Sequence, residues 1–335
     1  MMKRCTILGI AFLFSLVVAM FSGSQRIPPD RVLDVLLGRS ADAVTRQIIL
    51  DIRFPRVLLA GLAGAALAMA GASFQSLLRN PLADPYILGV SSGAAIGAVT
   101  SLSVFKAPST ITMGLCAFVA ACVTIFIVHM LSTRRSGETD ADRMLLVGMA
   151  FSSFSASMLI LFLGRSSGND ARAILHWLIG DVSGKRLSEI AMLLPQIIVL
   201  MGILMLLSHR FNLLALDGDV AASLGLDVAR QRRVGYLLAS FLTASIVCLS
   251  GSIGFVGLVV PHLARLLFSS DCRRLFPISA VLGATLLMLA DAIGRVAFAP
   301  FETPVGVITA LLGAPVFIYI LYSQRKRTLA ERIDG

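Results

Sequence analysis

The sequence offers few residues that could carry out chemistry of their own. A loop that holds nucleotide phosphates needs spaced glycines followed by Lys and then Ser or Thr. The nearest match is Gly184-Lys185-Arg186, which lacks the hydroxyl residue and has Ile179 where the first glycine would stand. We therefore predict no phosphate-binding loop, and ATP hydrolysis would need a separate protein.

Histidines, cysteines and acidic residues are not grouped as catalytic or metal sites require. The four histidines are dispersed along the chain, and the five cysteines include no C-x-x-C pair. Neither H-E-x-x-H nor G-x-S-x-G occurs. The sequence therefore predicts no catalytic residues, no cofactor and no metal ion, which counts against a membrane-embedded enzyme.

Ion-coupled transport would require acidic residues near the middle of apolar segments, where a charge is costly and therefore functional. Such residues are almost lacking, and the nearest candidate, Asp291, lies toward the outer end of its segment. An ion-coupled secondary transporter stays as the alternative function, and the missing acids count against it.

The elements that hold these residues follow from the composition. Hydrophobic residues make up 57% of the 335 residues and charged ones 14%, whereas soluble domains are about one quarter charged. Long apolar runs without strict alternation favour helices, each needing about 20 residues to cross a bilayer. The net charge of +10 is scattered over short loops, which is typical of cytoplasmic loops and does not indicate nucleic-acid binding.

The chain is predicted to be one all-α integral membrane domain, residues 1–335. A cleaved signal peptide could explain the first apolar run, but Ala19-Met20-Phe21 is a poor cleavage site and a retained helix is favoured. With both termini cytoplasmic, more than half of the 29 Lys and Arg residues fall inside, so we predict that orientation. The ten predicted spans are 5–23, 57–77, 88–105, 111–131, 144–163, 190–207, 234–249, 253–268, 278–298 and 305–322.

Two segments are punctuated by Gly and Pro. Arg79–Ala94 reads RNPLADPYILGVSSGA, and its prolines beside Asn and Asp predict a turn between two helices. Ser250–His262 reads SGSIGFVGLVVPH, with glycines every three residues before a proline. A close helix–helix contact would explain both. The residues of interest are Asn80, Pro81, Asp84, Pro85, Gly89, Ser91, Gly93, Gly254, Gly257, Pro261 and His262.

Together with GVITA at 306–310 and GAPVF at 313–317, these segments resemble the FecCD permease family. Its members are the transmembrane subunits of ABC importers for cobalamin, haem and ferric siderophores. The resemblance runs from Arg53 to about Tyr322 in matching order and spacing, and the RNPLAxP string is its most specific part. It implies a type II ABC importer permease fold of about ten transmembrane helices in the bacterial cytoplasmic (inner) membrane.

The resemblance also implies function and partners. The chain would form the translocation pathway for an iron chelate (ferric siderophore or haem) or cobalamin, without catalysis of its own. Its partners would be a second copy in a homodimer, two cytoplasmic ABC ATPase subunits, a periplasmic or lipid-anchored binding protein, and membrane lipid.

Site residues carried over by the resemblance fall into three groups. Docking to acidic residues of the binding protein is expected of Arg53, Arg56 and Arg295, because the guanidinium fork binds carboxylates well. The cytoplasmic gate region would include Thr139 and Asp140. The loop 209–233 would insert two short helices into the ATPase, through Leu213, Leu216, Asp217, Gly218, Asp219, Ala221, Ala222, Leu224 and Gly225.

Overall fold

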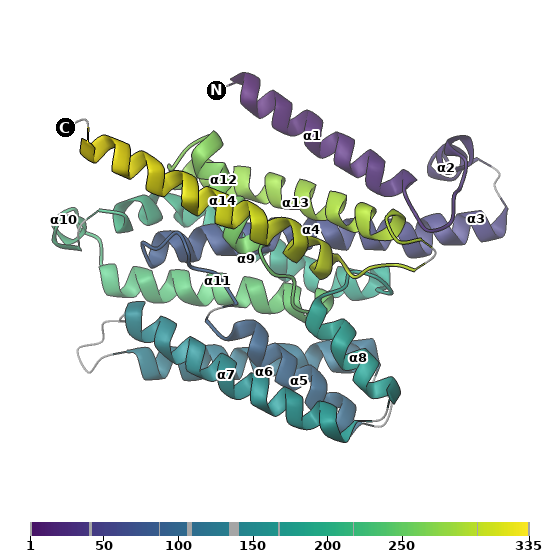
Figure 1. Cartoon of the computed structure of the whole chain (residues 1–335), viewed down its shortest axis with the longest axis horizontal. Helices are drawn as coiled ribbons and strands as arrows, with labels where there is room; N and C mark the ends of the chain where they lie inside the picture. Colours follow the sequence, from purple (N-terminus) through teal and green to yellow (C-terminus); the bar gives the residue numbers. More distant parts are fainter. Residues whose placement is uncertain are drawn as a thin grey trace.

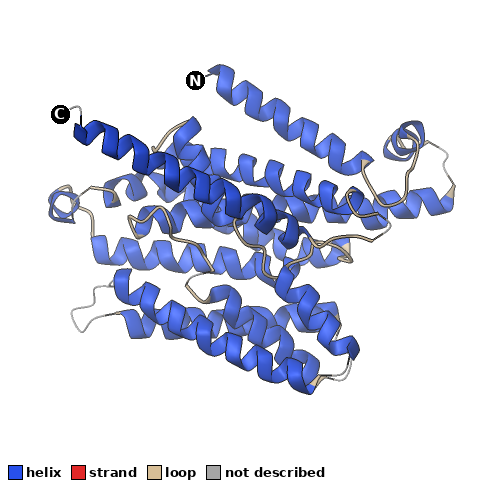
Figure 2. Ribbon diagram, viewed as in Figure 1, coloured by secondary structure: helices blue, strands red, loops and turns tan. Residues whose placement is uncertain are grey.

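The chain is built from helices (Figure 1) in a computed structural model that describes residues 2–39, 42–86, 88–105, 109–133, 141–166, 168–216, 218–299 and 301–333. No β-strand occurs in these ranges (Figure 2), which confirms the predicted all-α fold. The elements are α1 (Met2–Phe21), α2 (Pro29–Leu36), α3 (Ala43–Gln47), η1 (Ile48–Arg53), α4 (Phe54–Leu77), α5 (Val90–Val104), α6 (Thr110–Ser132), α7 (Ala141–Arg165), α8 (Gly168–Ile179), α9 (Leu187–Leu214), α10 (Gly218–Ser223), α11 (Val228–Ser250), α12 (Val256–Leu267), α13 (Cys272–Val296) and α14 (Val305–Ile333).

Each of the ten predicted spans overlaps one long helix: α1, α4, α5, α6, α7, α9, α11, α12, α13 or α14. Among the described residues, seven helices are long and apolar enough to cross a membrane. Shorter apolar helices cover Val90–Val104, Val256–Leu267 and Val305–Tyr319. The short helix α2 buries Val32 and Val35, whereas Leu33 and Leu36 are exposed.

Helix α4 lies at the centre of the bundle and packs against α13, α11, α12 and α9. In the continuous helix Ala43–Leu77, 78% of the most apolar window is buried, against 17% in α9. A helix that is apolar on all sides is expected to be buried by its neighbours. Pro55 is the second residue of α4, and because proline has no N–H, the carbonyl of Asp51 has no α-helical donor there. The preceding turn, Ile48–Arg53, is a π-helix in which Phe54 N–H donates to the carbonyl of Ile49.

Glycines allow α4 to approach two of these neighbours closely. A Cβ atom on Gly64 would lie 2.1 Å from the carbonyl oxygen of Gly283 in α13. A Cβ atom on Gly71 would lie 1.9 Å from the carbonyl oxygen of Gly257 in α12. Such crossings bring helix backbones together, and van der Waals packing at small residues is the main attraction between helices in lipid.

Helices α11 and α12 are separated by a non-helical segment, Gly251–Phe255. Gly251 has φ +66° and ψ −161°, a conformation open essentially to glycine alone. Phe255 also has a positive φ, +68°, and its side chain fills the space beside Gly313 of α14. This segment hydrogen-bonds to the end of α8, since Ser252 N–H donates to the carbonyl of Trp177.

Candidate functional site

The predicted turn after α4 consists of two successive turns of the same kind. The side chain of Asn80 accepts a hydrogen bond from the N–H of Leu82 at 2.9 Å, and that of Asp84 accepts one from Tyr86 at 2.9 Å. Each acceptor residue is followed by a proline, Pro81 or Pro85, whose ring fixes the φ of the proline itself at a value that suits a turn. The sequence thus determines this turn locally, and Asp84 becomes buried within it.

Beyond the turn, the predicted glycine face of α5 packs against α6. Gly89 begins α5 with φ +80°. A Cβ atom on Gly93 would lie 2.0 Å from Thr124 Oγ1, and one on Gly97 would lie 2.2 Å from the carbonyl oxygen of Cys116. These glycines therefore serve close helix contact, and Ser91 beside them is buried.

The proline of the second Gly/Pro segment, Pro261, was expected to break its span, but α12 continues through it from Val256 to Leu267. Because proline has no N–H, the carbonyl of Gly257 loses its helical donor. The buried amide of Gln75 in α4 donates to that carbonyl at 3.4 Å and to the carbonyl of Leu258 at 3.1 Å. Gln75 also accepts a hydrogen bond from Arg265, so one polar side chain joins α4 to α12. His262, the residue after Pro261, is buried. A Cβ atom on Gly254 would meet no other atom within 4 Å, so the space around this glycine is open.

Arg79 connects the same turn to the end of α9. Its Nε donates to the carbonyl of Leu214 at 2.9 Å, and a second guanidinium nitrogen donates to the carbonyl of Leu216. Arg79 adopts φ +50°, an uncommon conformation for a residue with a side chain. These carbonyls lack helical partners at a C-terminus, and a cation there also meets the favourable end of the helix dipole.

The predicted coupling segment consists of the end of α9, the short helix α10 and the turn that ends α10. Leu226 N–H donates to the carbonyl of Ala221 at 3.1 Å and Gly225 N–H to that of Ala222 at 2.9 Å, a Schellman ending. Gly225 has the left-handed φ, +83°, that this ending needs. Ala221 is buried, whereas apolar side chains remain exposed on Leu216, Val220 and Leu224.

Several predicted residues cannot be placed. Thr139 and Asp140, the gate residues, and Asp217 in the coupling segment lie outside the described residues, and so does the side chain of Asp219. Gly218 begins α10 and Leu213 belongs to the last turn of α9.

At the other end of α4, two of the three predicted docking residues form ion pairs with one buried carboxylate. Arg56 Nε lies 2.9 Å from Asp291 Oδ1, and Arg295 Nε lies 3.0 Å from Asp291 Oδ2. Asp291 therefore neutralises part of the charge of both arginines and is only 1% exposed.

The guanidinium groups also hold the end of α1. Arg295 donates to the carbonyls of Ala19 and Ser22, each at 2.8 Å. Arg53 donates to the carbonyls of Met20, at 3.3 Å, and Gln25. These carbonyls are at or beyond the C-terminus of α1, where a helix leaves its last acceptors unsatisfied.

The three predicted docking residues are buried. Arg53, Arg56 and Arg295 are 4%, 5% and 2% exposed, and each has partners within the chain. They line a pocket of about 250 Å³, and their role in docking stays a prediction. Glu302, which is partly exposed, also lines this pocket and forms an ion pair with Arg56. Burial raises the pKa of Glu302, but hydrogen bonds from Arg56 and Ser24 outweigh this and hold it below its ordinary value.

Comparison with known proteins identifies the chain. The profile of the FecCD transport family matches residues 10–323. The chain belongs to this family. It is 40% identical to the cobalamin import permease BtuC of Halobacterium salinarum over 288 residues, covering 85% of this chain and 76% of that protein. It is 34% identical to the Fe(3+)-citrate import permease YfmE of Bacillus subtilis over 321 residues, covering 96% and 95%.

Structural comparison gives the same answer for this FecCD permease. A solved structure described as an inward-facing conformation of a candidate metal-chelate type ABC transporter superposes with a TM-score of 0.85. It shares 30% identity and is matched over 96% of this chain and 100% of its own. The protein is thus a multi-pass membrane permease of the ABC importer type, with the predicted fold.

Sequence reasoning missed three polar residues, Gln75, Arg79 as a connecting residue, and Glu302. Each acts through partners more than 130 positions away, which no local pattern reveals. It also missed α8, although Ile174, Trp177 and Leu178 recur at helical spacing and the first two are buried.

Proposed function

We propose that this FecCD permease, as a homodimer in a bacterial cytoplasmic membrane, forms the pathway by which a large iron chelate or cobalamin enters the cell. A binding protein delivers the cargo, and two separate ATPase subunits supply the energy. Support for the cargo class comes from relatives described as cobalamin and Fe(3+)-citrate permeases. Both termini would be cytoplasmic, which places α10 on the ATPase side.

The observation that carries the proposal is the exposed apolar surface formed by Val220 of α10 and the flanking residues Leu216 and Leu224. Leu216, Val220 and Leu224 are four residues apart and are 41%, 49% and 59% exposed. On a cytoplasmic loop such a surface favours a helix that enters an apolar groove of a partner. The ATPase subunit is the partner that an ABC permease requires.

Arg79 links the segment that carries this surface to the turn between α4 and α5. Its guanidinium binds carbonyls on both sides of the bend that leads into α10, and its backbone begins the Asn80–Pro85 turn. Movement of α10 would therefore be passed directly to that turn. Gate residues near Thr139 and Asp140 are part of the same proposal.

For the opposite face, docking is proposed at the pocket above the arginines. An acidic side chain of the binding protein would displace Glu302 from Arg56 and reach the charged floor. In the free permease, the chain provides its own carboxylate at that place.

Reconstitution with the cognate ATPase and binding protein tests the transport proposal. We expect cargo uptake into proteoliposomes to require ATP and to persist with a protonophore. Uptake that continues without ATP and stops with a protonophore would instead establish an ion-coupled carrier.

A separate assay tests the coupling surface. Leu224→Asp should abolish ATPase binding, while Val44→Asp, at an equally exposed residue of α3, should not. Equal ATPase binding by wild type and Leu224→Asp would refute the assignment of α10.

A further inference from the structure

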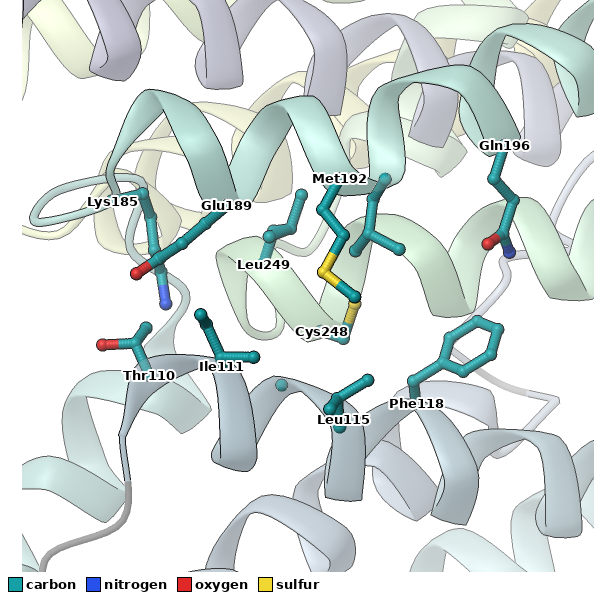
Figure 3. A pocket seen from close by; sticks show the side chains of 12 residues that line it. Thr110, Ile111, Leu115, Phe118, Lys185, Glu189, Met192, Gln196, Cys248 and Leu249 are labelled. Atoms are coloured by element: carbon teal, nitrogen blue, oxygen red, sulfur yellow. The ribbon is translucent and has the colours of Figure 1, made fainter.

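A groove between α6 and α9, floored by the end of α11, is not used by any of these sites. Its volume is about 260 Å³. Figure 3 shows Leu115 and Phe118 of α6 facing Met192 of α9 across it, with Cys248 of α11 at its base. Lys185 and Glu189 stand together at one end of the groove.

The groove opens sideways, toward the surroundings of the bundle. Leu115 is 48% exposed and Met192 61% exposed. Further along the same helices, Val119, Val123 and Val199 are exposed too. Such apolar surface on membrane-spanning helices is in contact with acyl chains. However, lipid tails are as apolar as these side chains, so an acyl chain alone gains little by lying in the groove rather than beside it. Preference for one lipid must come from the polar end.

That end carries two charges of opposite sign. In the described part of the chain, the side chains of Lys185 and Glu189 form no hydrogen bond and no ion pair with another residue, although the N–H of Glu189 donates to the carbonyl of Arg186 at the start of α9. Both side chains are partly buried. Burial lowers the pKa of the Lys185 ammonium, and the nearby Glu189 partly opposes this. Removing such groups from water without a partner is unfavourable, so a ligand that supplies both an anion and a cation would be complementary.

Geometry sets the depth and direction of such a ligand. Figure 3 shows the Lys185 nitrogen pointing toward Thr110 and Ile111, at the first turn of α6. The apolar part of the groove extends from there toward Phe118 and Gln196. Under the proposed topology, the start of α6 and the loop before α9 are at the outer surface, where phospholipid headgroups lie.

We propose that this groove binds one phospholipid with a phosphate and a primary ammonium, that is, a phosphatidylethanolamine of the outer leaflet. The phosphate contacts Lys185 and the ammonium contacts Glu189. One acyl chain lies along Leu115, Phe118 and Met192. Phosphatidylglycerol would offer Glu189 no cation, and the methylated ammonium of phosphatidylcholine could donate no hydrogen bond to it.

Native mass spectrometry of the intact, delipidated permease tests this, with phosphatidylethanolamine, phosphatidylglycerol and phosphatidylcholine of identical chains titrated separately. On the wild-type protein we expect one phosphatidylethanolamine adduct to persist at collision energies that remove the other two lipids. Lys185→Gln should weaken that adduct at least fivefold. Arg186→Gln changes the adjacent, exposed arginine, which does not line the groove, and should leave the adduct unchanged.

A charge exchange, Lys185→Glu with Glu189→Lys, provides a second measurement. Because it restores one charge of each sign at the same end, we expect it to regain part of the adduct that Lys185→Gln loses. Equal retention of the three lipids by the wild-type protein would overturn the proposal, as would stronger retention of phosphatidylglycerol. Equal weakening by Lys185→Gln and Arg186→Gln would also overturn it. The wild-type comparison holds even where a variant fails to fold.

Discussion

Adding one methyl group at Gly64 tests the packing at the centre of the permease. Its Cβ would lie 2.1 Å from the carbonyl oxygen of Gly283, whereas real Cβ atoms essentially never approach closer than 3.0 Å. Because both groups belong to helical backbone, α4 and α13 must move apart by roughly 1 Å in a densely packed interior. Overpacking costs about 3 kcal/mol at the upper end of its usual range. The better helix propensity of alanine returns about 1 kcal/mol.

The net loss for Gly64→Ala is therefore about 2 kcal/mol, which corresponds to a fall in Tm of roughly 4–8 °C. The assay heats the purified permease in detergent and measures the monodisperse fraction that remains. Gly61→Ala is the matched control one turn away, because its Cβ would meet Met288 Sδ at an ordinary 3.5 Å. We expect its Tm to stay at or slightly above that of the wild type. An unchanged Tm for Gly64→Ala, or the same fall for both variants, would refute the reasoning.

Three further predictions concern charged groups. Asp291→Asn leaves Arg56 and Arg295 buried without a carboxylate, so we expect it to destabilise the fold by about 3–5 kcal/mol. The loss is measured as a smaller fraction of monodisperse protein, and the control Asp51→Asn, at an exposed site, should have no effect. Burial raises the pKa of Asp84 to about 6, above its ordinary 3.8, so the folded state holds the proton more tightly and stability falls as pH rises from about 4 to 6. Asp84→Asn keeps the acceptor for Tyr86 and should flatten that dependence, raising the unfolding free energy at pH 7 by about 3 kcal/mol; an unchanged melting curve across this range would contradict it. Glu302→Gln removes the ion pair between Arg56 and Glu302, so we expect the affinity for the binding protein to rise several-fold, as measured by surface plasmon resonance. Weaker binding would show instead that Glu302 assists docking.

Much of the helical framework could be predicted from the sequence, because membrane spans need only length and apolar composition. The predicted span 57–77 falls within α4, Phe54–Leu77, and the Asn80–Pro85 turn follows from local side-chain chemistry. Helix α8 escaped because its pattern is amphipathic and its length is below that of a span. The non-helical segment Gly251–Phe255 lies within an apolar run, so hydropathy alone predicted more helix, from 253, than the structure contains.

The sites were less predictable, since their chemistry depends on partners far apart in the chain. The sequence placed Arg56 and Asp291 at the same end of the bundle, yet only the structure shows that they form an ion pair and that Glu302 also pairs with Arg56. Likewise, α4 is rich in Gly and Ala throughout. Which of its glycines are essential for close helix packing depends on where α12 and α13 cross α4, and these crossing points are known only from the structure.

The anchoring of α1 by arginines has a consequence for biosynthesis. Arg295 holds the carbonyl of Ser22 across 273 positions of sequence. At about 5–20 residues per second, roughly 14–55 seconds of translation separate the emergence of these two residues. Arg53 emerges only 28 positions after Gln25 and can bind carbonyls at this end of α1 early. The contacts from Arg295 must wait for the last turn of α13. The end of α1 is therefore fixed in two stages during synthesis, the first within the N-terminal segment and the second when α13 joins the bundle.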